Sequence, residues 1–306
     1  MTEITEFKTW IASGPWPIDG GLSGELEKRG HDLSDKLWSA RLLQAEPAAI
    51  AQVHQDYVDA GARIIITASY QASRQGFAAV GLSTDQADDL MRLSVTLAKD
   101  VADKSAQKVW VAASVGPYGA VLGGGQEYFG NYGVAHQDLV KFHRERIEVL
   151  ASANPDLFAC ETIPDLDEVN ALLEVLSAYP DIPAWITMSC KDGEHSCAGQ
   201  DISGLAKAVA NHPNIVAIGV NCTKPEFVTP LFEKLAKVSG LPLVVYPNAG
   251  RVWDGEARCW IGEGHSTLPI QIVKEWAQLG AKLIGGCCGL GPAAVTALNQ
   301  DLANLR

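Results

Sequence analysis

Short apolar runs alternate with longer segments of helical periodicity along the whole chain, and this alternation constrains the fold more than any other feature. Two of the runs, Ile64–Ile66 and Leu243–Val245, are apolar at every position. Such runs are typical of parallel strands that are covered on both faces. The eight predicted strands are Pro17–Gly20, Arg63–Ala68, Lys108–Val115, Leu157–Cys160, Ala184–Ser189, Val216–Asn221, Leu243–Tyr246 and Leu283–Gly286.

A helix is predicted after almost every strand, and proline or glycine marks several helix ends. Pro47 stands where one helix can begin, and Gly61 follows its last residue in the position that a C-terminal cap favours. The predicted helices are Gly24–Arg29, Leu33–Leu43, Pro47–Ala60, Asp85–Lys104, His136–Ala153, Leu166–Tyr179, Gly204–His212, Phe227–Val238, Ile270–Leu279 and Pro292–Leu305.

Eight successive βα units within 306 residues predict an α/β fold, a TIM (β/α)8 barrel formed by residues 1–306 as a single domain. A content of 47% hydrophobic residues suits the large core of such a barrel. An open doubly wound sheet is the alternative, but no Gly-x-Gly-x-x-Gly turn follows the first strand. No linker or low-complexity segment indicates a second domain.

The charge and the hydropathy pattern exclude two classes of partner. The net charge is −12 and no cluster of Lys and Arg interrupts it, so we expect no binding to nucleic acid. No apolar stretch approaches the roughly 18 residues that span a bilayer, and no signal peptide is apparent, so we expect no membrane association and a cytoplasmic location. The seven cysteines are an odd number, which in a reducing compartment favours free thiols or metal ligands over disulfides.

Polar residues follow the carboxyl ends of most predicted strands. In a TIM barrel these ends and the loops after them build the active site. The side chains at these ends are therefore our candidate catalytic and substrate-binding residues. They are Asp19, Thr67, Ser69, Glu161, Cys222, Asn248, Cys287 and Cys288.

Three of these residues are cysteines. Cys222 ends the sixth strand, and the adjacent pair Cys287 and Cys288, 65 positions further along, follows the eighth. Closure of the barrel would bring the three thiols together, where they could hold one Zn²⁺ and leave a fourth position open, as in catalytic zinc sites. Gly285 and Gly286 could supply the flexible backbone that lets adjacent cysteines reach one metal. The alternatives are buried hydrophobic thiols, a vicinal disulfide, or a zinc-binding or redox-sensing barrel without catalysis.

Three thiolates around Zn²⁺ have a definite chemical consequence. The site then carries a net charge of −1, which makes the zinc a poor activator of water. It suits a fourth thiol instead, because coordination removes the thiol proton at neutral pH. A thiolate is a good nucleophile for an activated methyl group, so methylation of a thiol substrate is the reaction that the cysteines favour.

Two carboxylates and two glycines extend this interpretation to an amino-acid substrate. Asp19 and Glu161 could bind an ammonium group, and the amides of Gly20 and Gly21 could approach a carboxylate without obstruction from side chains. Capping is the alternative role, because Asp19 precedes a glycine turn and Glu161 precedes a helix. An amino-acid thiol satisfies all three features.

Six motifs, in the same order along the chain, carry a family resemblance. They are Asp19-Gly-Gly-Leu-Ser-Gly-Glu-Leu-Glu-Lys-Arg-Gly30, Ser114-Val-Gly-Pro-Tyr-Gly119, Cys160-Glu-Thr162, Gly219-Val-Asn-Cys222, Tyr246-Pro-Asn-Ala-Gly250 and Gly285-Gly-Cys-Cys288. The chain resembles the zinc-dependent homocysteine S-methyltransferases, and most closely the short stand-alone bacterial members that use S-methylmethionine or S-adenosylmethionine.

The resemblance implies roles for individual residues. Cys222, Cys287 and Cys288 would bind Zn²⁺ and homocysteine would add its sulfur as the fourth ligand. The homocysteine ammonium group would face Asp19 and Glu161, and its carboxylate would lie near Gly20 and Gly21. Asn248 matches a position that ligates the metal when substrate is absent in a related domain, and Trp38 resembles an aromatic residue that lines the substrate pocket.

The resemblance also implies the reaction. A methyl group would pass directly from a sulfonium donor to homocysteine, giving methionine, because a chain of 306 residues leaves no room for folate- and cobalamin-binding domains. Relatives that use betaine carry a tyrosine after the glutamate, whereas this chain has Thr162. Betaine as donor and selenocysteine as acceptor are the alternatives. We expect a monomer or a small homo-oligomer.

Two long, aromatic-rich loops after strands, Leu122–Gly133 and Ala249–Pro269, could supply ring faces to the sulfonium cation. Their aromatic residues are Tyr128, Phe129, Tyr132, Trp253 and Trp260.

Overall fold

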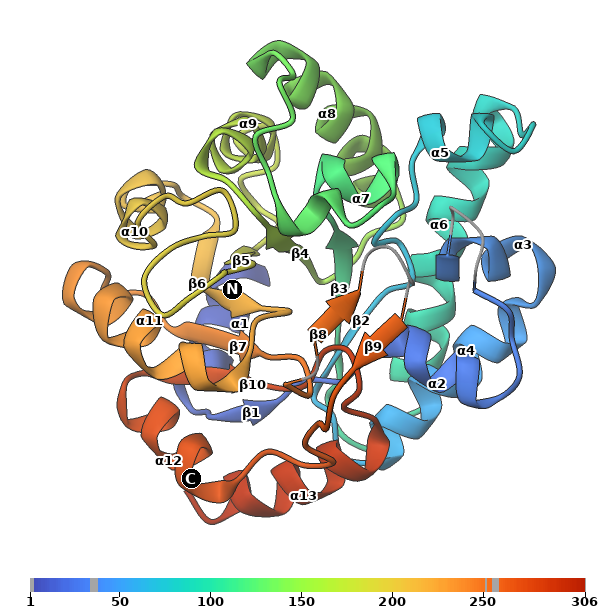
Figure 1. Ribbon diagram of the computed structural model, residues 1–306. Coiled ribbons are helices and arrows are strands. Elements are labelled where there is room, and N and C mark those ends of the chain that lie inside the picture. Colours follow the sequence, from blue (N-terminus) through green and yellow to red (C-terminus); the bar gives the residue numbers. More distant parts are fainter. Residues whose placement is uncertain (1–2, 34–37, 251, 255–258, 306) are drawn as a thin grey trace.

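Eight parallel strands form one sheet that curls into a barrel (Figure 1). The structure is a computed structural model and describes residues 3–33, 38–250, 252–254 and 259–305. The strands of the barrel are β1 (Trp16–Pro17), β2 (Ile64–Ile66), β3 (Trp110–Val115), β4 (Leu157–Ile163), β5 (Ala184–Met188), β6 (Ile215–Asn221), β7 (Leu243–Tyr246) and β10 (Ala281–Ile284).

The strand order is β1-β10-β7-β6-β5-β4-β3-β2, so β1 pairs with the last barrel strand, β10, and β1 and β2 stand at the two ends of the order. Closure occurs just beyond β1. There Ile18 pairs with Ile64 in a parallel bridge, and the Asp19 N–H donates to the Ile64 carbonyl over 3.1 Å. The predicted TIM barrel is therefore confirmed.

Helices surround the outer side of the barrel, and one helix, α1 (Glu3–Ala12), lies across the amino end of the barrel (Figure 1). They are α1 (Glu3–Ala12), α2 (Leu22–Lys28), η1 (Trp38–Arg41), α3 (Leu42–Ala45), α4 (Pro47–Asp59), α5 (Arg74–Ala78), α6 (Thr84–Ala102), α7 (Tyr118–Leu122), η2 (Gln126–Tyr128), α8 (His136–Ser152), α9 (Leu166–Leu176), α10 (Ser203–Val209), α11 (Pro225–Val238), α12 (Ile270–Gln278) and α13 (Pro292–Ala303). None of the helices that the structure describes combines the length and the apolar character needed to cross a membrane.

The core has two layers that follow from the alternation of side chains along each strand. One set of side chains fills the barrel interior, as Trp110 and Trp185 do, while their neighbours Val111 and Ile186 point outward and pack against the helices. Most strands are buried at every residue, which explains why they read as continuous apolar runs.

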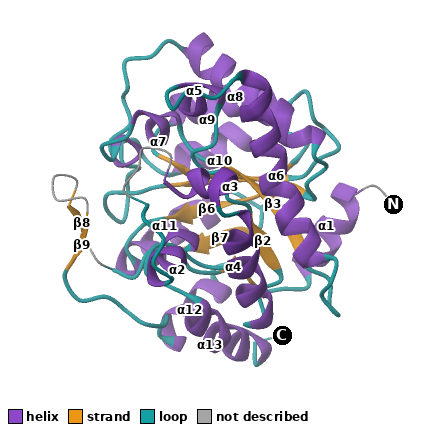
Figure 2. Cartoon of the chain, turned by 90° about the vertical axis from the view of Figure 1, so that its right-hand side faces the viewer, coloured by secondary structure: helices purple, strands orange, loops and turns teal. Residues whose placement is uncertain are grey.

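The two ends of the barrel differ. At the amino ends of the strands, α1 closes the barrel with Phe7 and Ile11, and Phe7 meets Trp110 edge-on with ring centroids 5.0 Å apart. At the other end a small antiparallel hairpin, β8 (Val252–Asp254) and β9 (Cys259–Ile261), projects away from the barrel (Figure 2). The carboxyl ends of the strands therefore remain available for a site.

The helix predicted over Leu33–Leu43 is confirmed only in part, because its described part is divided into two short pieces. There η1 and α3 form two short turns, and residues 34–37 lie outside the described residues. Several elements were not predicted, namely α1, α5, α7 and the hairpin inside the loop Ala249–Pro269.

Candidate metal centre and substrate cavity

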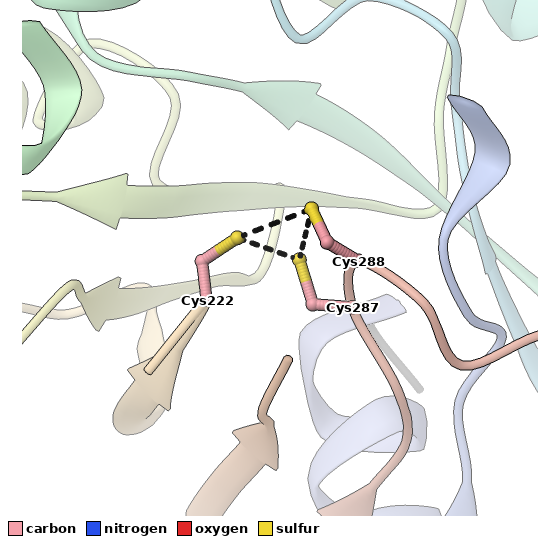
Figure 3. Close-up of side chains that lie close together, drawn as sticks. All are labelled: Cys222, Cys287 and Cys288. Carbon is pink, nitrogen blue, oxygen red and sulfur yellow. Dashed lines mark hydrogen bonds between the residues drawn. The ribbon is translucent and has the colours of Figure 1, made fainter. Parts of the chain in front are cut away.

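Three cysteine sulfurs meet at the carboxyl end of the barrel (Figure 3). Cys222 directly follows β6, and Cys287 and Cys288 follow β10, with β7 between these two strands. The Cys222 sulfur lies 2.8 Å from that of Cys287 and 3.7 Å from that of Cys288, and the sulfurs of the adjacent pair are 3.9 Å apart. Within the described chain, no other group of three or more His, Cys, Asp or Glu side chains is arranged to hold a metal ion.

Left-handed backbone at two residues helps to aim side chains into this end of the barrel. Cys222 has φ 48° and Thr162 has φ 60°, although neither is glycine. Asn221 holds Thr162, because its side-chain oxygen accepts the Thr162 N–H over 2.6 Å and its amide donates to Thr162 Oγ1 over 2.7 Å. Such conformations cost about 1–3 kcal/mol each and concentrate at functional sites.

Gly285 and Gly286 allow close packing at the end of β10. Neither has positive φ, and both cysteines that follow lie beyond the end of β10, where the alternation of a strand no longer fixes their directions. A Cβ on Gly285 would lie 2.7 Å from the Asp19 carbonyl oxygen, and one on Gly286 would lie 2.5 Å from the Leu290 Cβ.

The three thiols differ in acidity. Hydrogen bonds from Cys287 and Cys288 lower the pKa of the Cys222 thiol, whereas the hydrogen bond to Cys222 and burial raise the pKa of the other two. These directions favour a thiolate at Cys222. A divalent cation would displace the remaining protons.

The residues fit a zinc ion. Ligands of a tetrahedral zinc with Zn–S bonds of about 2.3 Å are about 3.8 Å apart. Two of the three sulfur separations match this value, and the third, between Cys222 and Cys287, would open by about 1 Å on binding. All six described cysteines are free thiols.

A cavity of about 100 Å³ lies beside the three sulfurs. Among its described lining residues are the three cysteines and three carboxylates, and none of them is Lys, Arg or His. The lining also includes aromatic and small residues. The described residues that line the cavity are Asp19, Gly20, Gly21, Leu22, Ser23, Ser39, Ile66, Thr67, Ala68, Tyr70, Glu127, Tyr128, Glu161, Thr162, Cys222, Tyr246, Gly286, Cys287 and Cys288.

Asp19 and Glu161 both reach the cavity as buried carboxyl groups. Burial raises the pKa of Asp19 well above its ordinary value, although a hydrogen bond from the Ile66 N–H, over 2.7 Å, lowers it. Burial also raises the pKa of Glu161 to about 7, while hydrogen bonds from Ser114 and Tyr246 lower it. A cationic ligand would stabilise both carboxylates in this desolvated place.

Gly20 and Gly21 line the cavity where the chain passes close to its neighbours. A Cβ on Gly21 would lie 2.8 Å from the Cys287 carbonyl oxygen, and one on Gly20 would lie 2.3 Å from that of Leu290. The Gly21 N–H donates to the Leu290 carbonyl over 3.0 Å, so a substrate carboxylate would meet the Gly20 amide more readily than the Gly21 amide.

Thr67 and Ser69 form a buried chain of hydrogen bonds beneath the cavity. Their hydroxyl oxygens are 2.7 Å apart, Thr67 Oγ1 accepts the Ser114 N–H, and the Ser69 hydroxyl donates to the Ser114 carbonyl. Thr67 lines the cavity, whereas Ser69 does not. Ser69 therefore supports the site from behind.

Asn248 is buried next to Cys222, with its amide nitrogen 3.5 Å from the Cys222 carbonyl oxygen. Its side-chain oxygen accepts the Gly250 N–H over 2.9 Å, so this oxygen is engaged with the backbone. Trp38 opens η1, and its side chain lies outside the described residues.

The aromatic residues of the two long loops separate into different roles. Tyr128 lines the cavity and its hydroxyl lies 3.5 Å from the Cys222 sulfur. Phe129 is 62% exposed, and Tyr132 packs against Tyr118. The side chains of Trp253 and Trp260 lie outside the described residues.

Sequence reasoning assigned no role to four residues that the structure brings to the site. Ser114 contacts Glu161 from the neighbouring strand β3 and Tyr246 contacts it from β7, and both belong to motifs that carried the resemblance. Tyr70 and Glu127 line the cavity from loops. No spacing or periodicity distinguishes these two, since they depend on how the loops fold over the barrel.

Comparisons with known proteins agree with this geometry. A family model described as homocysteine S-methyltransferase matches residues 18–302. The chain is 42% identical to homocysteine S-methyltransferase YbgG of Bacillus subtilis, covering 90% of each chain, and 42% identical to homocysteine S-methyltransferase of Escherichia coli, covering 92% of this chain and 93% of that one. The metallated form of the Escherichia coli homocysteine methyltransferase MmuM superposes with a TM-score of 0.85 at 40% identity, over 95% of this chain and 98% of that one. The chain belongs to the homocysteine S-methyltransferase family.

Proposed function

We propose that this protein transfers a methyl group from a sulfonium donor, S-methylmethionine or S-adenosylmethionine, to the thiol of homocysteine, giving methionine. Zn²⁺ held by Cys222, Cys287 and Cys288 would keep the bound substrate thiol deprotonated at neutral pH. The meeting of these three sulfurs beside a cavity lined by carboxylates is the observation that carries the proposal.

The chain's own residues would orient homocysteine. Asp19 and Glu161, both buried in the cavity lining, would accept hydrogen bonds from its ammonium group. The Gly20–Gly21 segment would face its carboxylate. Thr67 would border the substrate, while Ser69 would hold Thr67 in place.

Two residues have secondary roles in the proposal. Asn248 would ligate the metal only in the absence of substrate, and doing so would require its oxygen to leave the Gly250 N–H. Trp38 would border the pocket from η1.

The reaction then needs alignment more than acid–base chemistry. The homocysteine thiolate attacks the methyl carbon of the sulfonium in line, a carbon–sulfur bond forms to homocysteine, and the carbon–sulfur bond to the donor breaks. The donor leaves as a neutral thioether, so its leaving group needs no proton. Tyr128, 3.5 Å from Cys222, would border the path of the methyl group.

Three alternatives differ in donor, acceptor or chemistry. Betaine could serve as donor or selenocysteine as acceptor, and the thiols could sense redox state without catalysis. Thr162 stands where betaine-using relatives carry tyrosine, and its hydroxyl is engaged by Asn221, which favours a sulfonium donor.

A competition assay on reduced, zinc-loaded protein with homocysteine tests the proposal. S-methylmethionine, S-adenosylmethionine and betaine each carry a distinguishable isotopic methyl label, and mass spectrometry reads the label in methionine. We expect label from a sulfonium donor. Labelled methionine from betaine alone would show that betaine, rather than a sulfonium, is the donor. No labelled methionine from any donor would contradict methyl transfer to homocysteine.

A further inference from the structure

The cavity contains one more carboxylate than the homocysteine ammonium group requires. Asp19 and Glu161 lie near each other, since the charge of Glu161 raises the pKa of Asp19. Glu127 is the third carboxylate, and it comes from a different element, the short helix η2. Because none of the described lining residues is Lys, Arg or His, no cationic side chain of that lining balances it.

The segment that carries Glu127 is fixed against the site. The Ser189 hydroxyl, just beyond β5, donates to the Glu127 carbonyl over 3.1 Å. The neighbouring Tyr128 hydroxyl lies 3.5 Å from the Cys222 sulfur, and the Asn131 N–H donates to Asp165 Oδ2 over 3.0 Å. Contacts to three different elements therefore hold η2 beside the thiols.

The Glu127 carboxylate lacks a partner for one of its oxygens. Its Oε2 atom is buried and makes no hydrogen bond to any of the residues that the structure describes. Burial, together with the charge of Cys222, raises the pKa of Glu127 to about 7, although a hydrogen bond from its own backbone lowers it. A buried carboxylate oxygen without a partner is unfavourable, and a bound cation would relieve this cost.

Asp19 and Glu127 reach the cavity from different segments of the chain, Asp19 from just beyond β1 and Glu127 from η2. The charge of Asp19 acts on Tyr57, and the charge of Glu127 acts on Tyr70 and Tyr128, while the charge of Glu161 acts on both Asp19 and Tyr70. Methyl transfer between two amino acids brings two ammonium groups to one site, one on the acceptor and one on the donor. Asp19 with Glu161 can receive the ammonium group of the acceptor, which leaves the Glu127 carboxylate for a second ammonium group.

We propose that Glu127 binds the α-ammonium group of the methyl donor, so that the site selects sulfonium donors that are themselves amino acids. This inference rests on the proposed function. It makes Glu127 a residue that determines donor specificity, and it gives a reason for discrimination against betaine, whose quaternary nitrogen has no N–H to donate.

Two donors that differ only in the ammonium group test the inference. They are S-methylmethionine and its analogue without the amino group, 4-(dimethylsulfonio)butanoate, each assayed at saturating homocysteine on reduced, zinc-loaded protein. We expect the wild type to prefer S-methylmethionine about 10- to 100-fold in kcat/KM. Glu127→Gln should remove most of that preference by lowering kcat/KM for S-methylmethionine alone, with the KM for homocysteine unchanged.

Glu194→Gln is the matched control, because Glu194 lies in the loop after β5 and its side chain is 61% exposed. This control should keep the wild-type preference, and Glu127→Asp, which retains the charge, should keep part of it. An equal decrease in kcat/KM for both donors in Glu127→Gln would overturn the inference, and so would a raised KM for homocysteine with the donor preference unchanged. Absence of methionine with both of these donors and with S-adenosylmethionine in the wild type would contradict the proposed function itself, so the two failures are distinguishable.

Discussion

Cys222 combines a left-handed backbone, φ 48°, with a sulfur that meets those of Cys287 and Cys288. An L-residue adopts this conformation only when its surroundings compensate for the strain. Here the neighbouring Asn221 is tied to Thr162 by two hydrogen bonds. The site thus depends on backbone geometry as well as on three residue types.

Cys222→Ala should abolish metal binding, because the two remaining thiols are too few to hold the ion. We expect bound zinc to fall from one ion per chain to near zero, measured by elemental analysis, and turnover to fall more than about 100-fold. Cys197→Ala is the control, since Cys197 is a free thiol outside the cluster, and it should retain zinc. A Cys222→Ala protein that kept full activity without zinc would refute the assigned ligand.

Glu161→Gln should stabilise the fold while weakening substrate binding. A carboxyl whose pKa rises from 4.5 to about 7 on folding costs the folded state up to about 3 kcal/mol once it is ionised. The cost is absent below pH 4.5, where the group is protonated in both states, and complete above about pH 7. Thermal denaturation should therefore show a higher Tm for the variant at pH 8 and little difference near pH 4.5.

The same variant should raise the KM for homocysteine about 10- to 100-fold, because a charge-assisted hydrogen bond to the ammonium group is lost. Glu174→Gln, on the exposed side of α9, should change neither property appreciably. A Glu161→Gln protein with unaltered KM would remove Glu161 from the substrate site.

At the scale of elements, the strand ends could be predicted from sequence and the loops could not. Eight apolar runs located the strands, and barrel closure then placed residues from β1, β4, β6 and β10 at one end. Glu127 and Tyr70 lie in loops whose path depends on tertiary contacts, such as the bond from Ser189 to the Glu127 carbonyl. The local sequence pattern does not indicate such contacts.

The helix α1 shows the same limit. No helix was predicted over Glu3–Ala12, yet Phe7 and Ile11 are buried in the barrel interior. Burial of these two side chains is favourable only once the barrel has formed, because they fill its open end at the amino ends of the strands. The need for such a closing element follows from the fold as a whole rather than from the segment.

Phe7→Ala should destabilise the protein by about 3–5 kcal/mol, the usual cost of removing a fully buried phenylalanine. Because Phe7 lies at the opposite end of the barrel from the thiols, kcat at a temperature well below the Tm should remain unchanged. Val80→Ala, at a position that is 46% exposed, is the control for stability. Chemical denaturation gives the free energies of unfolding, and a loss of kcat with intact stability would contradict this division between the two ends.

For the whole molecule, a net charge of −12 and a cavity lined by carboxylates favour cationic substrates. S-methylmethionine carries a net positive charge at pH 7, whereas homocysteine is a zwitterion. Raising the salt concentration from about 0.02 to about 0.5 M should lower kcat/KM for S-methylmethionine about two- to tenfold and leave the KM for homocysteine nearly constant. Equal salt effects on the kinetic constants of both substrates would show that the negative potential of the protein does not favour binding of the donor.

In the proposed function, three cysteine thiolates hold a zinc ion whose open position receives the thiol of homocysteine. Zinc X-ray absorption of the reduced, zinc-loaded protein tests it most directly, because the number of sulfur neighbours at about 2.3 Å can be counted. We predict three sulfurs and one lighter ligand without substrate, and four sulfurs after homocysteine is added. Three sulfurs in both states would contradict the claim, and fewer than three would show that the cysteines do not form the site together.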